Sequence, residues 1–249
     1  MSIWTVALPK GGSAKTTTAA ELAAHLAGLG RRVLAIDACQ QGDLGTRLGL
    51  LEDTPVAADT ADVLLGAATV EDAAIPSPAV AGVDVLAGTR DLANLHHHPE
   101  VLTAFRDILP ALTTWSDVVI DTPPAIDLAT LAALAAADRV IVPVVAAGEA
   151  FDQVEELQQL ITTRIAPRLN PGCRIGWIIP TQQRAGRCLD ADVLSTLHDH
   201  YPGRVTSPVR EAVAVRESYL AGLPVSHYAP HHPVASDYHT AINTILEEA

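Results

Sequence analysis

The chain has 249 residues, of which 49% are hydrophobic, and a formal net charge of −13. This apolar content suffices for a core that covers a sheet on both faces, and no apolar run reaches the ~18 residues of a membrane-spanning helix. The acidic balance is opposite to that of a general nucleic-acid binder. Three cysteines without C-x-x-C spacing or a signal peptide are typical of a protein of the reduced cytosol.

A strand and a helix are predicted on either side of a glycine-rich turn. Residues 2–8 are apolar and rich in β-branched and aromatic types, and residues 16–29 place apolar side chains at helical spacing. The turn between them reads KGGSAKTTT and contains the only two lysines of the chain, Lys10 and Lys15. In such a turn, backbone N–H groups bind phosphates, a lysine reaches the terminal phosphates, and a hydroxyl binds Mg²⁺. The pattern predicts a nucleotide pocket in which Lys15 and Thr16 take the last two roles.

The turn departs from the usual phosphate-binding pattern G-x-x-x-x-G-K-[ST] at Pro9 and Ala14. It resembles instead the deviant Walker A motif, K-G-G-x-x-K-[ST], of the ParA/MinD family of dimerising ATPases. The resemblance implies that the chain binds ATP and Mg²⁺, and that Lys10 reaches across a dimer interface to the ATP of the other subunit. The residues that it places around the nucleotide are Gly11, Gly12, Ser13, Ala14, Lys15, Thr16 and Thr17.

A second apolar run ends in Asp37, which predicts a parallel strand that brings this carboxylate to the ligand edge of the sheet. Residues 31–43 resemble the family stretch V-L-L-I-D-x-D-P-Q-G, which implies a catalytic and metal-binding role for Asp37. The second aspartate of that stretch, which positions or activates the attacking water, is Cys39 here. Two interpretations stay open. Either Asp37, Gln41 or Asp43 assists the water and hydrolysis is slow, or the protein binds ATP and dimerises but hardly hydrolyses it.

A third apolar strand ends in Asp121 and is stopped by two prolines. Residues 115–124 resemble the Walker B element of the same family, Y-D-x-I-I-I-D-x-P-P. By this resemblance Asp121 holds Mg²⁺ through a water and helps to orient the γ-phosphate. The implied metal residues are Thr16, Asp37 and Asp121, and the implied catalytic residues are Lys10, Lys15, Asp37 and Asp121.

The rest of the chain continues the alternation of strands and helices. Residues 140–144 and 174–180 predict strands, residues 149–165 predict a helix, and residues 51–78 predict short helices and loops. Without a linker or an internal repeat, this order predicts one doubly wound α/β domain, with a mostly parallel sheet and helices on both faces. The resemblance makes it a P-loop NTPase domain over residues 1–249, with no N-terminal helix-turn-helix extension.

Two further segments extend the resemblance toward the C-terminus. Residues 181–183 fall where relatives often contact adenine, and residues 207–225 are similar in layout to the family stretch I-P-R-N-V-x-x-x-E-A-x-x-x-G-x-P-I. By this resemblance Gln182 and Pro208 belong to the nucleotide site.

The resemblance also implies partners. These are a second copy of the chain in an ATP-dependent homodimer, non-specific DNA, and a ParB-like centromere-binding protein that stimulates hydrolysis. Such a cycle partitions plasmid or chromosome cargo in the cytoplasm, in association with the nucleoid. The arginines predicted to hold DNA are Arg184, Arg187, Arg210 and Arg216, and the alternative is that they pair with the many surface acids.

Two other classes are disfavoured. A MinD-type membrane helix carries lysine or arginine on its polar face, and residues 217–249 contain neither. An iron–sulfur reductase or a related biosynthetic enzyme of this fold needs suitably placed cysteines, which three scattered ones do not provide. A nucleotide-gated adaptor that recruits a partner without turnover remains the main alternative, because of Cys39.

Overall fold

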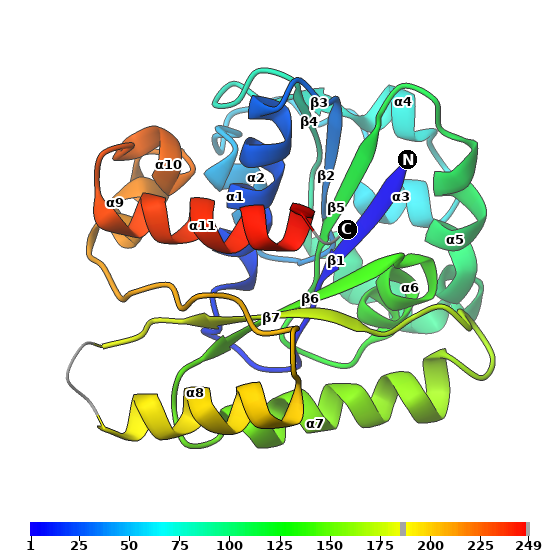
Figure 1. The fold of residues 1–249 in the computed structure, drawn as a ribbon. Helices are drawn as coiled ribbons and strands as arrows, with labels where there is room; N and C mark the ends of the chain where they lie inside the picture. Colours follow the sequence, from blue (N-terminus) through cyan, green and yellow to red (C-terminus); the bar gives the residue numbers. More distant parts are fainter. Residues whose placement is uncertain (185–187, 248–249) are drawn as a thin grey trace.

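Seven strands form one sheet in the order β3-β4-β2-β5-β1-β6-β7 in the computed structural model, which describes residues 1–184 and 188–247 (Figure 1). All neighbouring strands are parallel except the edge pair of β3 and β4. The strands are β1 Ser2–Val6, β2 Val33–Asp37, β3 Ile75–Pro76, β4 Val83–Leu86, β5 Asp117–Asp121, β6 Arg139–Val145 and β7 Ile175–Thr181.

Helices occupy the connections between the strands. The α-helices are α1 Lys15–Gly28, α2 Asp43–Arg47, α3 Thr60–Leu64, α4 Val70–Ala73, α5 Ala104–Ile108, α6 Leu128–Ala136, α7 Ala150–Leu160, α8 Cys188–His200, α9 Ala214–Leu220, α10 Val225–Tyr228 and α11 Pro233–Glu247. Short 3₁₀ helices span Arg90–His97, Pro99–Thr103 and Leu109–Ala111. Within the described residues, no helix is both long and apolar enough to cross a membrane.

The sheet is covered on both faces, which confirms the predicted doubly wound α/β fold. Because side chains alternate along a strand, Val33 and Ala35 of β2 pack with α1 and α11, whereas Leu34 and Ile36 pack with α3 to α6 on the other face. Helices α7 and α8 lie together over β6 and β7 (Figure 1). Strands buried on both faces explain the continuous apolar runs of the sequence.

The helix predicted over residues 149–165 is present, but its last turn is π-helical rather than α-helical. Helix α7 ends at Leu160, and a π-helical turn follows over Ile161–Ile165. The hydroxyls of Thr162 and Thr163 donate to the carbonyl oxygens of Gln158 and Gln159, and such side-chain bonds compete with the regular helical ladder.

The sheet register brings the predicted acidic residues together. Asp37 ends β2 and is the register partner of Asp121 at the end of β5, and Asp121 is in turn the partner of Val6 in β1. The turn between β1 and α1 therefore leaves the sheet beside both carboxylates. Parallel strands ending at one edge are the usual setting of a ligand site in this class of fold.

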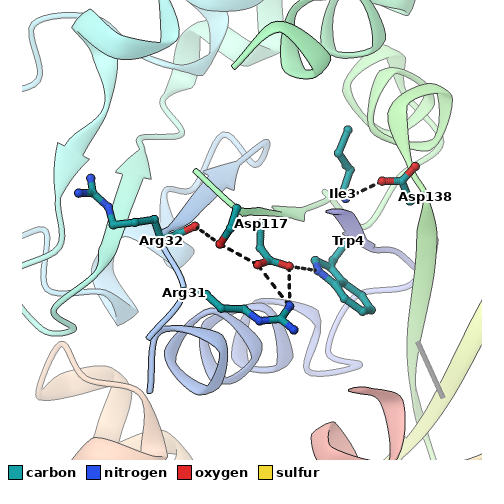
Figure 2. A network of polar contacts seen from close by, with 7 residues as sticks. Ile3, Trp4, Arg31, Arg32, Asp117 and Asp138 are labelled. Atoms are coloured by element: carbon teal, nitrogen blue, oxygen red, sulfur yellow. Dashed lines mark hydrogen bonds and ion pairs between the residues drawn. The ribbon is translucent and has the colours of Figure 1, made fainter. Parts of the chain in front are cut away.

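At the opposite end of the strands, away from the ligand site, the buried carboxylate of Asp117 holds the sheet through several hydrogen bonds (Figure 2). It accepts hydrogen bonds from the indole of Trp4 at 3.0 Å, the guanidinium of Arg31 at 3.1 Å and the hydroxyl of Ser116 at 3.0 Å. Asp138 accepts a further bond from the backbone N–H of Ile3 at 2.8 Å. A buried charge is stable only when it is paired and hydrogen-bonded, so this network ties β1 and β5 together away from the ligand edge.

Candidate nucleotide site

The loop between β1 and α1 contains two residues in the left-handed backbone conformation and leads into the start of α1 at the ligand end of the strands. Gly12 and Ala14 both lie in the left-handed region, with φ of 75° and 67°. For Ala14 this conformation costs about 1 kcal/mol, since its Cβ approaches the backbone. Helix α1 has no acidic residue in its first turn, so its positive end is not neutralised from within. Strain of this kind at the start of a helix accords with a loop shaped to bind an anion.

The two lysines point in different directions. Lys15 is buried, and its Nζ donates to the carbonyl oxygen of Lys10 at 2.7 Å. Burial lowers the pKa of Lys15, and the negative charge of Asp121 opposes that shift. The Lys10 side chain is 53% exposed and faces Glu149 at 3.4 Å. An exposed ion pair is weak, so the Lys10 ammonium can leave it for a stronger partner.

Three potential metal ligands from Asp37, Cys39 and Asp121 lie within 4.8 Å of one another. The Thr16 hydroxyl beside Asp121 opposes the rise of the Asp121 pKa, and the Oδ1 of Asp121 is buried without a hydrogen-bond partner. Burial, followed by the charge of Asp37, raises the pKa of Asp121. A buried carboxylate oxygen without a donor fits a cation or the water that a cation holds, so Thr16 and Asp121 suit Mg²⁺.

Asp37 lies in this cluster, but its oxygens are already used. They accept the backbone N–H groups of Cys39 at 3.0 Å, Leu44 at 2.9 Å and Gly45 at 3.3 Å, so the carboxylate caps the start of α2. Burial raises the pKa of Asp37, and these N–H groups oppose the shift. A Cβ at Gly88 would lie 2.3 Å from the Cys39 carbonyl oxygen and 2.9 Å from Asp37 Cγ, so only glycine fits there. Nothing local in the sequence marks Gly88, because its contacts come from another strand.

Cys39 is a buried, protonated thiol. Its Sγ lies 3.9 Å from Asp121 Oδ2, within reach of a weak S–H donation. Burial, with the charges of Asp121 and Asp37, raises the pKa of the Cys39 thiol far above its usual range. The thiol is thus neutral at the position where the family pattern has a carboxylate.

A cavity of about 360 Å³ is lined by Lys15 and by Cys39 of this cluster. All seven predicted loop residues from Gly11 to Thr17 line it. Asp43, Arg47 and Tyr219 line it as well. Arg47 and Tyr219 were not predicted from sequence, since α2 and α9 are far apart in the chain and only the fold brings them to the loop.

A second cavity, of about 370 Å³, lies on the other side of the loop and includes Gln182. The Gln182 side chain donates to the Gly12 carbonyl oxygen at 2.6 Å, which joins the end of β7 to the phosphate loop. Pro208 is half-buried and directly precedes Val209, which lines this cavity. The two residues predicted to lie near the base thus fall at or beside one pocket.

The four arginines predicted to hold DNA differ in their surroundings. Arg184 forms an ion pair with Glu211, and Arg210 forms one with Asp237, with Nη2 to Oδ1 at 2.9 Å. Arg216 is exposed on α9 and lines the second cavity. Arg187 lies outside the described residues. Two of the four thus have acidic partners, as the alternative interpretation expected.

Comparisons with known sequences identify the family. A family profile described as an AAA domain matches residues 1–175. The chain is 34% identical over 238 residues to the chromosome partitioning protein ParA of Caulobacter vibrioides, covering 92% of this chain and 87% of the relative. It is 32% identical over 242 residues to the chromosome-partitioning ATPase Soj of Thermus thermophilus, covering 95% and 92%.

Solved structures with the same fold cover nearly all of the chain. The cell division ATPase MinD of Pyrococcus furiosus superposes with a TM-score of 0.80 at 23% identity, covering 100% of this chain and 99% of that one. Cobyrinic acid a,c-diamide synthase from Mycobacterium smegmatis, with a bound ATP analogue and magnesium, gives 0.84 at 26% identity, covering 100% and 95%. Sequence motifs, site geometry and these relatives agree: the chain belongs to the ParA/Soj/MinD family of P-loop ATPases.

Proposed function

We propose that the chain is an ATP-driven dimer switch of the partition type. ATP and Mg²⁺ bind between two subunits, the closed dimer holds DNA non-specifically, and hydrolysis stimulated by a ParB-like partner releases it. The observation that carries the proposal is the contrast between a buried Lys15 beside the acidic cluster and an exposed Lys10 on the same loop. One lysine serves its own subunit, and the other is placed to serve a neighbour.

Two further observations support the partition assignment. Curated relatives named as partition proteins reach 34% identity over most of both chains. Thr16 and Asp121 suit Mg²⁺, which neutralises the triphosphate and stabilises the charge that develops during phosphoryl transfer when it is bound. The same proposal puts the protein in the cytoplasm, in part on the nucleoid.

Size-exclusion chromatography with ADP, ATP or a non-hydrolysable ATP analogue, with and without non-specific DNA, tests the proposal. We expect a monomer with ADP, a dimer with ATP and its analogue, and co-elution with DNA only of the dimer. Raising the salt concentration is expected to release the DNA, because phosphate contacts are salt-dependent. A monomer that ignores both ATP and DNA contradicts the proposal.

Arg216 provides the sharper test of the DNA contact. Arg210 is held by Asp237, so reversing its charge would place two acids together and disturb α11. Arg216 is exposed on α9 and is not among the residues with an ion pair in the described part of the chain. Arg216 also lines the second cavity, so ATP binding is measured in parallel and DNA co-elution is compared at saturating ATP, where Arg216→Glu is expected to weaken DNA binding. Unchanged DNA binding removes Arg216 from the contact.

The second candidate function is a nucleotide-gated adaptor that dimerises with ATP but hardly turns over. The neutral Cys39 thiol beside Asp121 is the observation that favours it. An ATP-locked dimer with negligible phosphate release would support this candidate over the partition switch.

Replacing Cys39 with Asp separates the two candidates. A carboxylate at this position can hold and activate a water, so we expect steady-state phosphate release to rise about tenfold. That rise is below the roughly 100- to 10,000-fold effect of a general base, because a third buried carboxylate beside Asp37 and Asp121 resists ionisation. Cys39→Ser, which adds no carboxylate, is the matched control. No rise in Cys39→Asp contradicts the idea that Cys39 limits turnover.

A further inference from the structure

The two carboxylates of the metal cluster, Asp37 and Asp121, are not free to accept a proton from water. Asp37 gives both of its oxygens to three backbone N–H groups that shape the turn into α2. The Oδ2 of Asp121 faces the Cys39 thiol, and its Oδ1, which has no hydrogen-bond partner, is the oxygen that suits the cation. If hydrolysis occurs, the group that activates the water has to come from elsewhere on the cavity wall.

Asp43 is the carboxylate that lines the phosphate cavity in the described part of the chain. It is half-buried, and its Oδ1 accepts the phenolic O–H of Tyr219 at 2.8 Å. Its other oxygen has no hydrogen-bond donor among the described residues. The side chain is thus anchored through one oxygen and has the second available.

Both ends of this anchor are fixed. Asp43 begins α2, and the N–H groups of the next two residues are the ones that Asp37 accepts, so Asp43 cannot shift without breaking the cap. Tyr219 is held by the buried guanidinium of Arg47, which lies 5.1 Å from its ring centroid. The hydrogen bond from Tyr219 orients the carboxylate and raises the pKa of the phenol.

The negative charge of Asp43 acts on the two carboxylates of the metal cluster. Burial raises the pKa of Asp37 and Asp121, and the negative charge of Asp43 adds to the rise of both. Asp43 also lines the same cavity as Lys15 and Thr16, the groups that would hold a γ-phosphate, so its carboxylate belongs to the wall on which an attacking water would sit.

We propose that Asp43 positions and deprotonates the attacking water in this chain, and that Tyr219 holds it in place. This inference rests on the proposed ATP hydrolysis. The water oxygen bonds to the γ-phosphorus, and the bond from that phosphorus to the β–γ bridging oxygen breaks with its electron pair on ADP. The proton of the water passes to Asp43 and then to solvent. Asp43 is the catalytic residue, and Tyr219 is a positioning residue.

Gln41 is the competing candidate, since it also lines the cavity and is exposed. Its amide can orient a water but cannot take a proton at neutral pH. Asp43 offers both actions, and its oxygen is already held by a neighbour. The structure therefore favours Asp43 over Gln41.

The test compares Asp43→Asn, Tyr219→Phe and Gln41→Ala with the wild-type chain in steady-state ATP turnover and in ATP binding. We expect Asp43→Asn to lower kcat by about 100-fold. Its KM is expected to be unchanged or lower, because a negative charge near the triphosphate is removed. Tyr219→Phe keeps the Asp43 carboxylate but removes the hydrogen bond that orients it, so we expect kcat to fall by about tenfold with KM unchanged. Asp53→Asn, an exposed acid on the loop after α2, is the control and keeps wild-type turnover.

A double variant separates catalysis from folding. In the Cys39→Asp background a second carboxylate can serve the water, so Asp43→Asn is expected to cost less than it does alone. A purely structural role of Asp43 would cost the same in both backgrounds, and would raise KM.

Each outcome decides a separate point. Turnover of Asp43→Asn above half of wild type, or a larger loss in Gln41→Ala, overturns the role of Asp43. If Asp43→Asn fails to fold, retention of full kcat by Tyr219→Phe overturns it instead. A wild-type chain that binds ATP and dimerises but releases no phosphate overturns this inference and leaves the ATP-dependent dimer standing. A wild-type chain that does not bind ATP contradicts the proposed function itself.

Discussion

Lys15→Ala is expected to abolish ATP turnover without lowering the stability of the protein. The Lys15 ammonium is a buried cation on the wall of the phosphate cavity and lies beside Asp121, so its loss removes charge where the terminal phosphates would lie. Loss of one such preorganised donor costs about 100- to 1,000-fold in kcat, and we expect the upper end together with weaker ATP binding. Phosphate release and ATP titration calorimetry measure the two effects.

The thermal stability of Lys15→Ala is expected to stay the same or rise, although its activity is lost. Burial lowers the pKa of Lys15, which means that the folded protein disfavours its charge. Removing the ammonium also removes this cost, so the melting temperature of Lys15→Ala should equal or exceed that of wild type. Lys15→Arg is the matched variant: it keeps a positive charge in a wider, planar group that does not replace a compact ammonium in a tight loop. Hydrolysis within tenfold of wild type in Lys15→Ala would contradict the assigned role.

The sequence predicted the fold because the signals for this fold are local. Apolar runs that end in Asp37 and Asp121 identify buried parallel strands, and the register of β2 with β5 then places the two acids side by side. The phosphate loop is likewise a local feature, and its residues Gly11 to Thr17 line one cavity. The prediction missed the π-helical turn after Leu160, because threonine hydroxyls that bond the preceding carbonyls leave the apolar periodicity unchanged.

Contacts between segments far apart in the chain could not be predicted from the sequence. Tyr219 reaches Asp43 across 176 positions of the chain, and no spacing rule predicts such a pair. The close approach of Gly88 to the Asp37 turn is of the same kind. Sequence reasoning did mark Cys39 as the departure from the family pattern, and the structure adds the physical consequence: a neutral thiol facing Asp121 and a carboxylate, Asp43, that keeps one oxygen free.

Lys10→Ala is expected to leave ATP binding to the monomer within about threefold while it removes the ATP-dependent dimer and most of the turnover. The Lys10 side chain is 53% exposed and its only ion-pair partner among the described residues is Glu149, so little in its own subunit depends on it. A cationic group supplied in trans to a phosphoryl transfer is worth about 1,000-fold or more in kcat. Sedimentation or light scattering with a non-hydrolysable analogue follows the dimer, and Glu149→Gln, which removes only the local partner, is the control expected to dimerise normally.

Mixing two inactive variants tests the shared site directly. In a dimer of one Lys10→Ala and one Lys15→Ala subunit, the site on the first subunit has its own Lys15 and the Lys10 of its neighbour, whereas the other site lacks both lysines. Random pairing would make half of the dimers mixed, and the weaker Lys10→Ala homodimer raises that share. Each mixed dimer has one complete site of two, so the mixture should regain between about one quarter and one half of the wild-type turnover. If Lys10 acted only within its own subunit, no combination would contain a complete site and the mixture would stay inactive. Recovery of turnover in the mixture would show that each active site is built from both subunits, because neither variant is active by itself.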